Sequence, residues 1–136
     1  MLGEKLYDLT AKVSGQRILP GDAPGEVLVE VSFQGTGKLL GIDTIESGTY
    51  TCRMTAAGVL HGKGQGLSLT AAGEAVTWQG IGVGKPTGDG MAASWRGSIM
   101  YATASQKLAQ LNTTAAVFEW DVDAQGNAKG ATWQWK

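Results

Sequence analysis

Glycine recurs at every second position in two short stretches of the chain, GKGQG at residues 62–66 and GIGVG at residues 80–84. A period of two is the period of a β-strand, so the glycines of each stretch line one face of one strand. The segment TAAGEA at residues 70–75 separates the two stretches and carries Gly73, a residue typical of tight turns. The pattern therefore predicts a hairpin whose two strands share a stripe without side chains.

The sequence leaves open the register of this hairpin and the direction of its glycine stripe. A turn around Gly73 with an odd number of residues pairs position 62 with 84, 64 with 82 and 66 with 80, whereas an even number sets the glycines against Ile81 and Val83. Glycines that face inward open a cavity, or they relieve strain in a bent wall while neighbours such as Trp78 fill the space, and we favour this second role. If they face outward, the lumen is lined by His61, Lys63, Gln65, Thr77 and Gln79.

Alternation of apolar and polar residues predicts eight strands in all, at residues 7–14, 27–34, 48–55, 59–70, 75–85, 94–101, 117–122 and 131–136. Short turns connect most of them, and the only helical candidate is SQKLAQLN, Ser105–Asn112, at most two turns long and capped by Ser105. We therefore predict an all-β single domain, residues 1–136, forming an eight-stranded antiparallel up-and-down β-barrel with one short helix near residues 105–112. A sandwich of two sheets is the alternative.

The eight short strands, the stretches GKGQG and GIGVG, the interruption SQKLAQLN and the tryptophan-rich end ATWQWK resemble the small bacterial barrels of calycin-like or allene oxide cyclase-like type. The resemblance covers most of the chain as architecture, and no functional residue of that family is matched position by position. It implies an antiparallel barrel with an apolar interior, often assembled as a dimer or trimer. The allene oxide cyclases themselves are isomerases of a lipid epoxide that act without a cofactor.

Composition narrows the function classes. Eleven basic and twelve acidic residues give a net charge of −1, and without a basic run we expect no nucleic-acid partner. A single cysteine, Cys52, and a single histidine, His61, exclude an internal disulfide and a structural zinc site, so we expect no metal and no cofactor. The chain shows no stretch typical of a membrane helix or a signal peptide, which predicts a cytoplasmic protein without membrane contacts.

The segment around the predicted helix is the expected mouth of the barrel. Tyr101 ends the strand that enters this segment and Asn112 begins the strand that leaves it, so both side chains are expected at the rim. Trp95 and Ile99 share the strand face of Tyr101 and predict an apolar wall beneath that rim. A short helix across the mouth can cap the pocket and gate it.

Tyr50 and Glu119 are further candidates for ligand binding. The hydroxyl of Tyr50 can orient a ligand, although a tyrosine is equally suited to the barrel wall. Glu119 reaches the pocket only if its strand is turned with Glu119 inward, and Phe118 makes the better inward residue. In the favoured orientation Glu119 lies on the outer face, where it can contact Arg96 across the strands.

Three functions fit these observations. We favour a barrel that binds a small apolar or aromatic molecule in its lumen without catalysis, because no set of nucleophile, base and orienting group is evident. The alternatives are a cofactor-independent isomerase or cyclase of a hydrophobic substrate, and a closed structural barrel whose lumen is filled by Trp78, Trp95 and Trp120. Ile81 and Val83 are exposed if the glycines face inward, which predicts self-association, as a dimer rather than a trimer.

Overall fold

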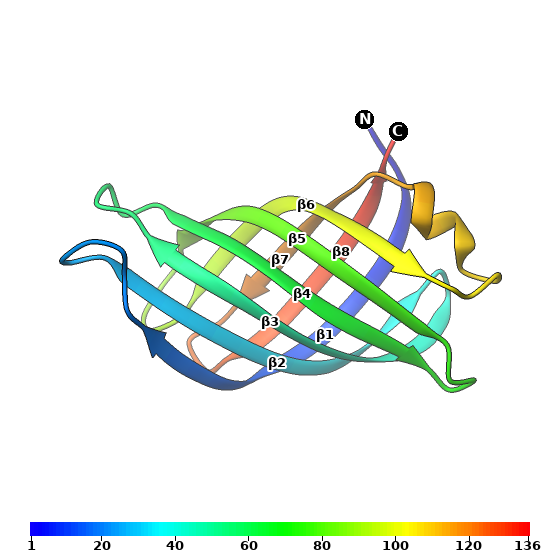
Figure 1. Cartoon of the computed structure of the whole chain (residues 1–136), viewed down its shortest axis with the longest axis horizontal. Coiled ribbons are helices and arrows are strands. Elements are labelled where there is room, and N and C mark those ends of the chain that lie inside the picture. The colour runs from blue at the N-terminus through cyan, green and yellow to red at the C-terminus, as the bar shows by residue number, and fades with distance from the viewer.

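Each strand of the chain pairs with the strand that follows it in sequence, and the last strand pairs with the first. The computed structural model describes residues 1–136, and its eight antiparallel strands close into one barrel (Figure 1). The strands are β1 (Leu2–Leu19), β2 (Val27–Leu39), β3 (Ile42–Met54), β4 (Leu60–Thr70), β5 (Ala75–Pro86), β6 (Ala93–Thr103), β7 (Ala116–Val122) and β8 (Asn127–Trp135). This confirms the predicted up-and-down barrel and excludes the sandwich, because β1 and β8 are hydrogen-bonded neighbours.

The β2–β3 hairpin is tighter than the sequence prediction, and β3 is correspondingly longer. Residues 39 and 42 pair, so Leu40 and Gly41 alone form the turn, with φ values of 50° and 79°. Positive φ at both turn residues matches the twist of the flanking strands. As a result β3 begins at residue 42 rather than at Gly48, and its inward face gains Glu46.

The β4–β5 hairpin has a loop with an odd number of residues, as in the first of the two predicted registers, but its pairing is shifted by two residues. Gly62 lies opposite Gly82 and Gly64 opposite Gly80, while residue 66 lies opposite Trp78. The loop has three residues, 71–73, because the backbone amide of residue 70 donates to the carbonyl of residue 74. A loop of this kind needs its positive φ at the last residue rather than the middle one. Gly73, at φ 82°, takes that last place, which moves the centre of the turn to residue 72.

The glycines of β4 and β5 face into the barrel, and aromatic rings occupy most of the space above them. A Cβ atom at Gly62 would lie 2.7 Å from Cζ3 of Trp95, and one at Gly84 would lie 2.8 Å from Cδ2 of the same ring. At Gly66 an added Cβ would overlap the ring of Trp78. The glycine stripe therefore accommodates tryptophans inside a closed wall, as favoured from the sequence. The residues that alternate with the β4 glycines, including His61, point outward and are exposed.

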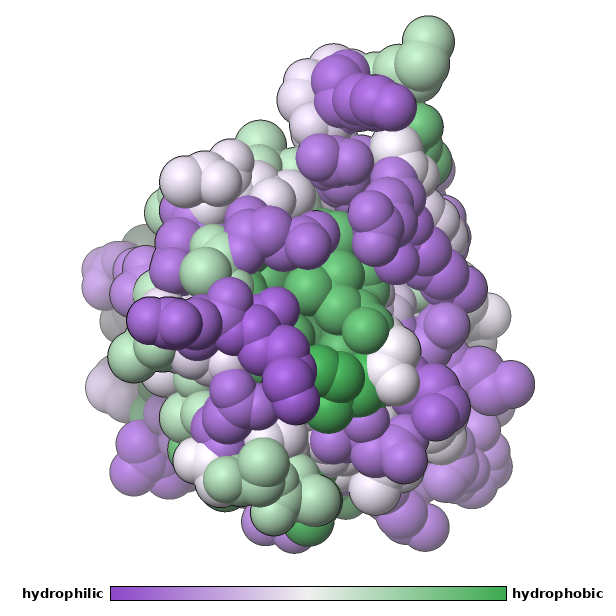
Figure 2. All heavy atoms as spheres, turned by 90° about the vertical axis from the view of Figure 1, so that its right-hand side faces the viewer, coloured by the Kyte–Doolittle hydropathy of each residue, from purple (hydrophilic) through white to green (hydrophobic).

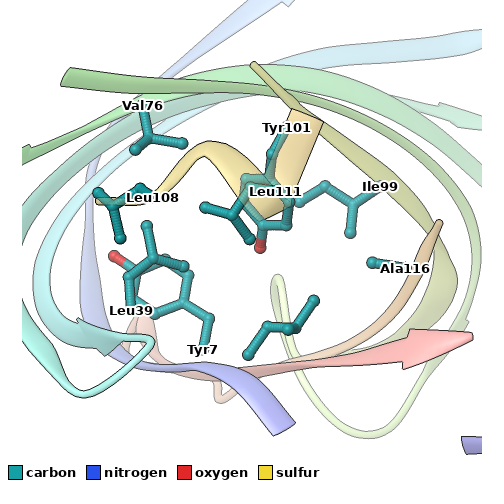
Figure 3. Packing of buried hydrophobic residues seen from close by; sticks show 9 residues of the cluster. Tyr7, Leu39, Val76, Ile99, Tyr101, Leu108, Leu111 and Ala116 are labelled. Carbon is teal, nitrogen blue, oxygen red and sulfur yellow. The ribbon is translucent and has the colours of Figure 1, made fainter. Parts of the chain in front are cut away.

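Two hydrophobic clusters fill the barrel, one towards each end. The first lies at the end where the β6–β7 connection crosses, and comprises Leu6, Tyr7, Leu39, Val76, Ile99, Tyr101, Leu108, Leu111 and Ala116 (Figure 3). The second comprises Ala11, Phe33, Leu60, Ala93, Trp95, Trp120, Val122 and Ala128. Trp78 and Phe118 pack against both clusters and join them into one core.

The β6–β7 connection contains the only helical segment, and this segment is shorter than predicted. It is a five-residue 3₁₀ helix, η1 (Ala109–Thr113), which begins after the predicted cap Ser105. The Ser105 hydroxyl still orders the approach to η1, because it accepts a hydrogen bond of 3.3 Å from the amide of Leu108. Figure 2 shows this end of the barrel, with a hydrophobic centre encircled by hydrophilic residues. No helix in the structure is long and apolar enough to cross a membrane.

Candidate functional site

A single carboxylic acid, Glu46, lies inside the barrel. Its side chain points inward from β3 and the residue is 1% exposed. The Ser68 hydroxyl, directly across on β4, donates to Oε2 at 2.7 Å, and the Trp78 indole on β5 donates to Oε1 at 2.7 Å. Both carboxyl oxygens thus accept a hydrogen bond from a neutral group, and neither oxygen contacts a cation.

Burial raises the pKa of Glu46 from its ordinary value to about 7, although its two hydrogen bonds act in the opposite direction. No basic residue offsets this effect. The lysines and His61 are exposed, and the half-buried Arg53 pairs with Glu26 and Asp22 instead. The interior therefore contains one acid that exchanges a proton near neutral pH and has no counter-ion.

Two tyrosine hydroxyls belong to the same polar layer as Glu46. The Tyr7 hydroxyl lies 2.9 Å from Oγ1 of Thr44, and the Tyr101 hydroxyl donates to Oγ1 of Thr132 at 3.2 Å. Burial raises the pKa of both tyrosines, and the nearby Glu46 charge raises each further. Every buried side-chain nitrogen and oxygen in the structure has a hydrogen-bond partner. The layer is thus a satisfied polar belt within an apolar barrel, and the hydroxyls in it remain protonated.

A cavity of about 90 Å³, here called the luminal cavity, lies next to this belt. The cavity borders the glycines of β4 and β5. At Gly80 no aromatic ring takes the place of the missing side chain, because a Cβ atom added there would meet no other atom closer than 3.4 Å. Five of its lining residues form an aromatic group whose neighbouring ring centroids lie 4.6 to 6.5 Å apart. This group, the aromatic cage, comprises Phe33, Tyr50, Trp78, Trp95 and Trp120.

Four of the residues predicted from the sequence to bind a ligand line this cavity, namely Tyr50, Trp95, Ile99 and Tyr101. Glu119 also borders it, but its side chain is on the outer face, where Oε1 lies 3.6 Å from Nε of Arg96. Phe118 points inward instead, as the alternation favoured. The predicted residues are thus brought together in the wall, with the Glu119 carboxylate outside it.

Asn112 is the one predicted ligand-binding residue that does not line the luminal cavity. Asn112 is exposed and lies away from the cavity, because its side-chain amide is bound to the end of β6. Its Oδ1 accepts from the Thr103 amide at 2.8 Å and its Nδ2 donates to the Thr103 carbonyl at 2.9 Å. The mouth expected beneath this segment is also filled, since Leu108 and Leu111 are fully buried and insert among the first cluster (Figure 3).

The sequence analysis missed Glu46 and Tyr7 as residues of the site. The signal for Glu46 is present, because it continues the inward alternation of Gly48 and Tyr50 towards the start of β3. The third predicted strand begins at Gly48, so the predicted alternation stops two residues short of Glu46. Tyr7 begins the first predicted strand and is buried in the structure, but nothing in the sequence shows that its face meets Glu46.

Comparison with known proteins supports the fold and leaves the activity open. No family model matches the chain, and no curated protein matches its sequence. A β-barrel-like protein from Acinetobacter baumannii superposes with a TM-score of 0.83 at 15% identity, covering 100% of this chain and 96% of that one. A conserved protein of unknown function from Rhodopseudomonas palustris gives 0.81 at 13% identity, covering 99% of both chains.

A more distant match is an enzyme from Penicillium herquei, with a TM-score of 0.67 and 13% identity over 96% of this chain and 92% of that one. At such identities the likeness extends to the fold alone. The barrel architecture of these structures agrees with the resemblance to small bacterial barrels noted from the sequence.

Proposed function

We propose that the barrel binds a small aromatic or apolar molecule in the luminal cavity. The observation that carries this proposal is the luminal cavity itself, which borders Gly80, where an added Cβ would have its nearest neighbours at 3.4 to 3.8 Å, whereas Trp95 lies tightly over Gly62 and Gly84 and Trp78 over Gly66. One buried water needs roughly 10–15 Å³, so a cavity of about 90 Å³ has room for a small organic molecule rather than a single water. Water alone would be poorly bonded there, because the wall is mainly aromatic and aliphatic.

The test is to fill the cavity from the wall. Gly80→Val directs a branched side chain from the wall into the luminal cavity without changing the outer surface, and valine suits a strand. Gln79→Val on the outward face of the same strand is the matched control. Binding of toluene, followed by tryptophan fluorescence, should fall at least about tenfold in Gly80→Val and stay unchanged in Gln79→Val. Equal toluene binding by both variants and the wild type would contradict the proposal.

Conversion of the ligand is the second candidate function, and Glu46 is the observation that favours it. A carboxyl with a pKa of about 7 can both accept and return a proton near neutral pH, which a cofactor-independent isomerase or cyclase requires. Cys52 does not add a nucleophile, since burial raises the pKa of its thiol. Native mass spectrometry of the protein purified from cells would reveal a retained ligand. Because isomers have equal mass, chromatography of the ligand released from the wild type and from Glu46→Gln would show whether Glu46 is needed for its conversion. The cytoplasmic location expected from the sequence stays a prediction.

A further inference from the structure

The carboxylate of Glu46 has no counter-ion within the protein. When ionised, the carboxylate has the Ser68 hydroxyl and the Trp78 indole as its partners, and both are neutral. A buried charge is costly unless an opposite charge accompanies it. Since no lysine, arginine or histidine side chain enters the barrel, a cation can reach Glu46 only from outside the chain.

The rings around the cavity favour the same charge. The face of an aromatic ring is negative, and tryptophan attracts a cation more strongly than phenylalanine or tyrosine. Three tryptophans belong to the aromatic cage, and one of them, Trp78, also donates to Glu46. Trp78 stacks on Phe33 with an interplanar angle of 21° and a centroid distance of 6.3 Å. The carboxyl and the rings are therefore parts of one site.

Other ligand charges fit this site less well. An anion would meet Glu46 and the negative ring faces without any positive group to compensate, which disfavours carboxylates such as fatty acids. A neutral aromatic molecule would fill the cavity but leave the carboxyl with the partners it already has. From the uncompensated carboxyl at the edge of a small aromatic cavity, we infer that the ligand is a small aromatic base whose protonated nitrogen pairs with Glu46. This inference rests on the proposed function.

Benzylamine and benzyl alcohol test it as probes of nearly equal shape and different charge. At about pH 8 Glu46 is ionised and benzylamine is protonated. Benzylamine should bind the wild type at least about tenfold more tightly than benzyl alcohol, as followed by tryptophan fluorescence. Glu46→Gln should lose this preference while retaining benzyl alcohol, and Glu4→Gln, which changes an exposed carboxylate away from the cavity, should keep it.

The pH dependence of the wild type gives a second measurement that needs no folded variant at position 46. The preference for benzylamine should decline as the pH falls below about 7, because Glu46 then takes up a proton. Tyr7 from β1 and Tyr101 from β6 are the titratable groups that face Glu46, and burial keeps both neutral here. Ser68 from β4 and Trp78 from β5 do not titrate in this range.

The outcomes separate the two proposals. Equal affinity for both probes, or a preference that survives in Glu46→Gln and at low pH, would overturn the inference and leave the proposed function intact. If neither probe binds and Gly80→Val has no effect on toluene, the proposed function falls and the inference falls with it.

Discussion

Glu46 couples the stability of the barrel to pH through its buried position on β3, where its carboxyl accepts hydrogen bonds from Ser68 and Trp78. Its pKa is about 7 in the folded barrel and near the ordinary 4.5 when unfolded, so the folded state binds this proton more tightly between those values. The contribution is fully present below about pH 4.5 and is lost as the pH rises through about 7. The size of the shift corresponds to about 3 kcal/mol. Urea unfolding should therefore give a free energy that falls between about pH 5 and pH 8.

Glu46→Gln is the variant that isolates this effect, since glutamine has no proton to exchange. Its free energy of unfolding should change much less over the same pH range, whatever its absolute stability. Glu119→Gln should follow the wild type, because Glu119 is exposed on the outer face. A pH dependence in Glu46→Gln equal to that of the wild type would show that another group is responsible.

Gly62 leaves room for the ring of Trp95 in the aromatic cage, because it has no side chain. The Cβ of Gly62→Ala would lie 2.7 Å from the Trp95 ring, which is itself buried and packed between Gly62 and Gly84. We expect the free energy of unfolding to fall by about 1–3 kcal/mol, the usual cost of overpacking a core. Gly80→Ala is the control, because its methyl group would make only ordinary contacts, the nearest at 3.4 Å. Equal stability of the two variants in urea would contradict this account of the glycine stripe.

At the scale of the elements, the sequence predicts strands better than it predicts turns. The hairpin loop at residues 71–73 follows from its glycine, although the sequence does not fix which of the three places Gly73 takes. The β2–β3 turn is harder to recognise, because Leu40 occupies a positive-φ position where asparagine or glycine is usual. Without that turn, β3 is six residues too short and Glu46 lies outside any predicted strand.

Asn112 holds the connection between β6 and β7 in place, so we expect it to contribute to stability rather than to ligand binding. Asn112→Ala removes two hydrogen bonds to the Thr103 backbone at an exposed position. We expect the free energy of unfolding to fall by about 1 kcal/mol, with toluene binding unchanged. Gln110→Ala, which removes an exposed side-chain amide from the same segment, is the control and should leave the free energy of unfolding nearly unchanged. Loss of toluene binding in Asn112→Ala at unchanged stability would contradict this and show that Asn112 takes part in ligand binding.

For the whole molecule, closure of the barrel follows from local patterns because every strand pairs with its sequence neighbour. Eight short alternating segments with glycines inside them leave few other arrangements. The cavity does not follow in this way, since it depends on how rings from distant strands share the interior. Trp95 lies within 3 Å of a Cβ atom added at Gly62 or Gly84, for example, whereas the nearest neighbour of one added at Gly80 is 3.4 Å away. The wall residues of the site could thus be predicted, and the position of the empty space could not.

The outer wall of β5 and β6 carries the basis for a final prediction, self-association. Ile81 is 67% exposed, Val83 54% and Met100 67%, and grouped apolar side chains on an exterior wall are typical of a contact with a partner. We expect light scattering at micromolar concentration to give a mass above the 14.1 kDa of one chain, in agreement with a dimer. Ile81→Lys combined with Val83→Lys should give a folded monomer, and a wild-type mass of 14.1 kDa would refute the prediction.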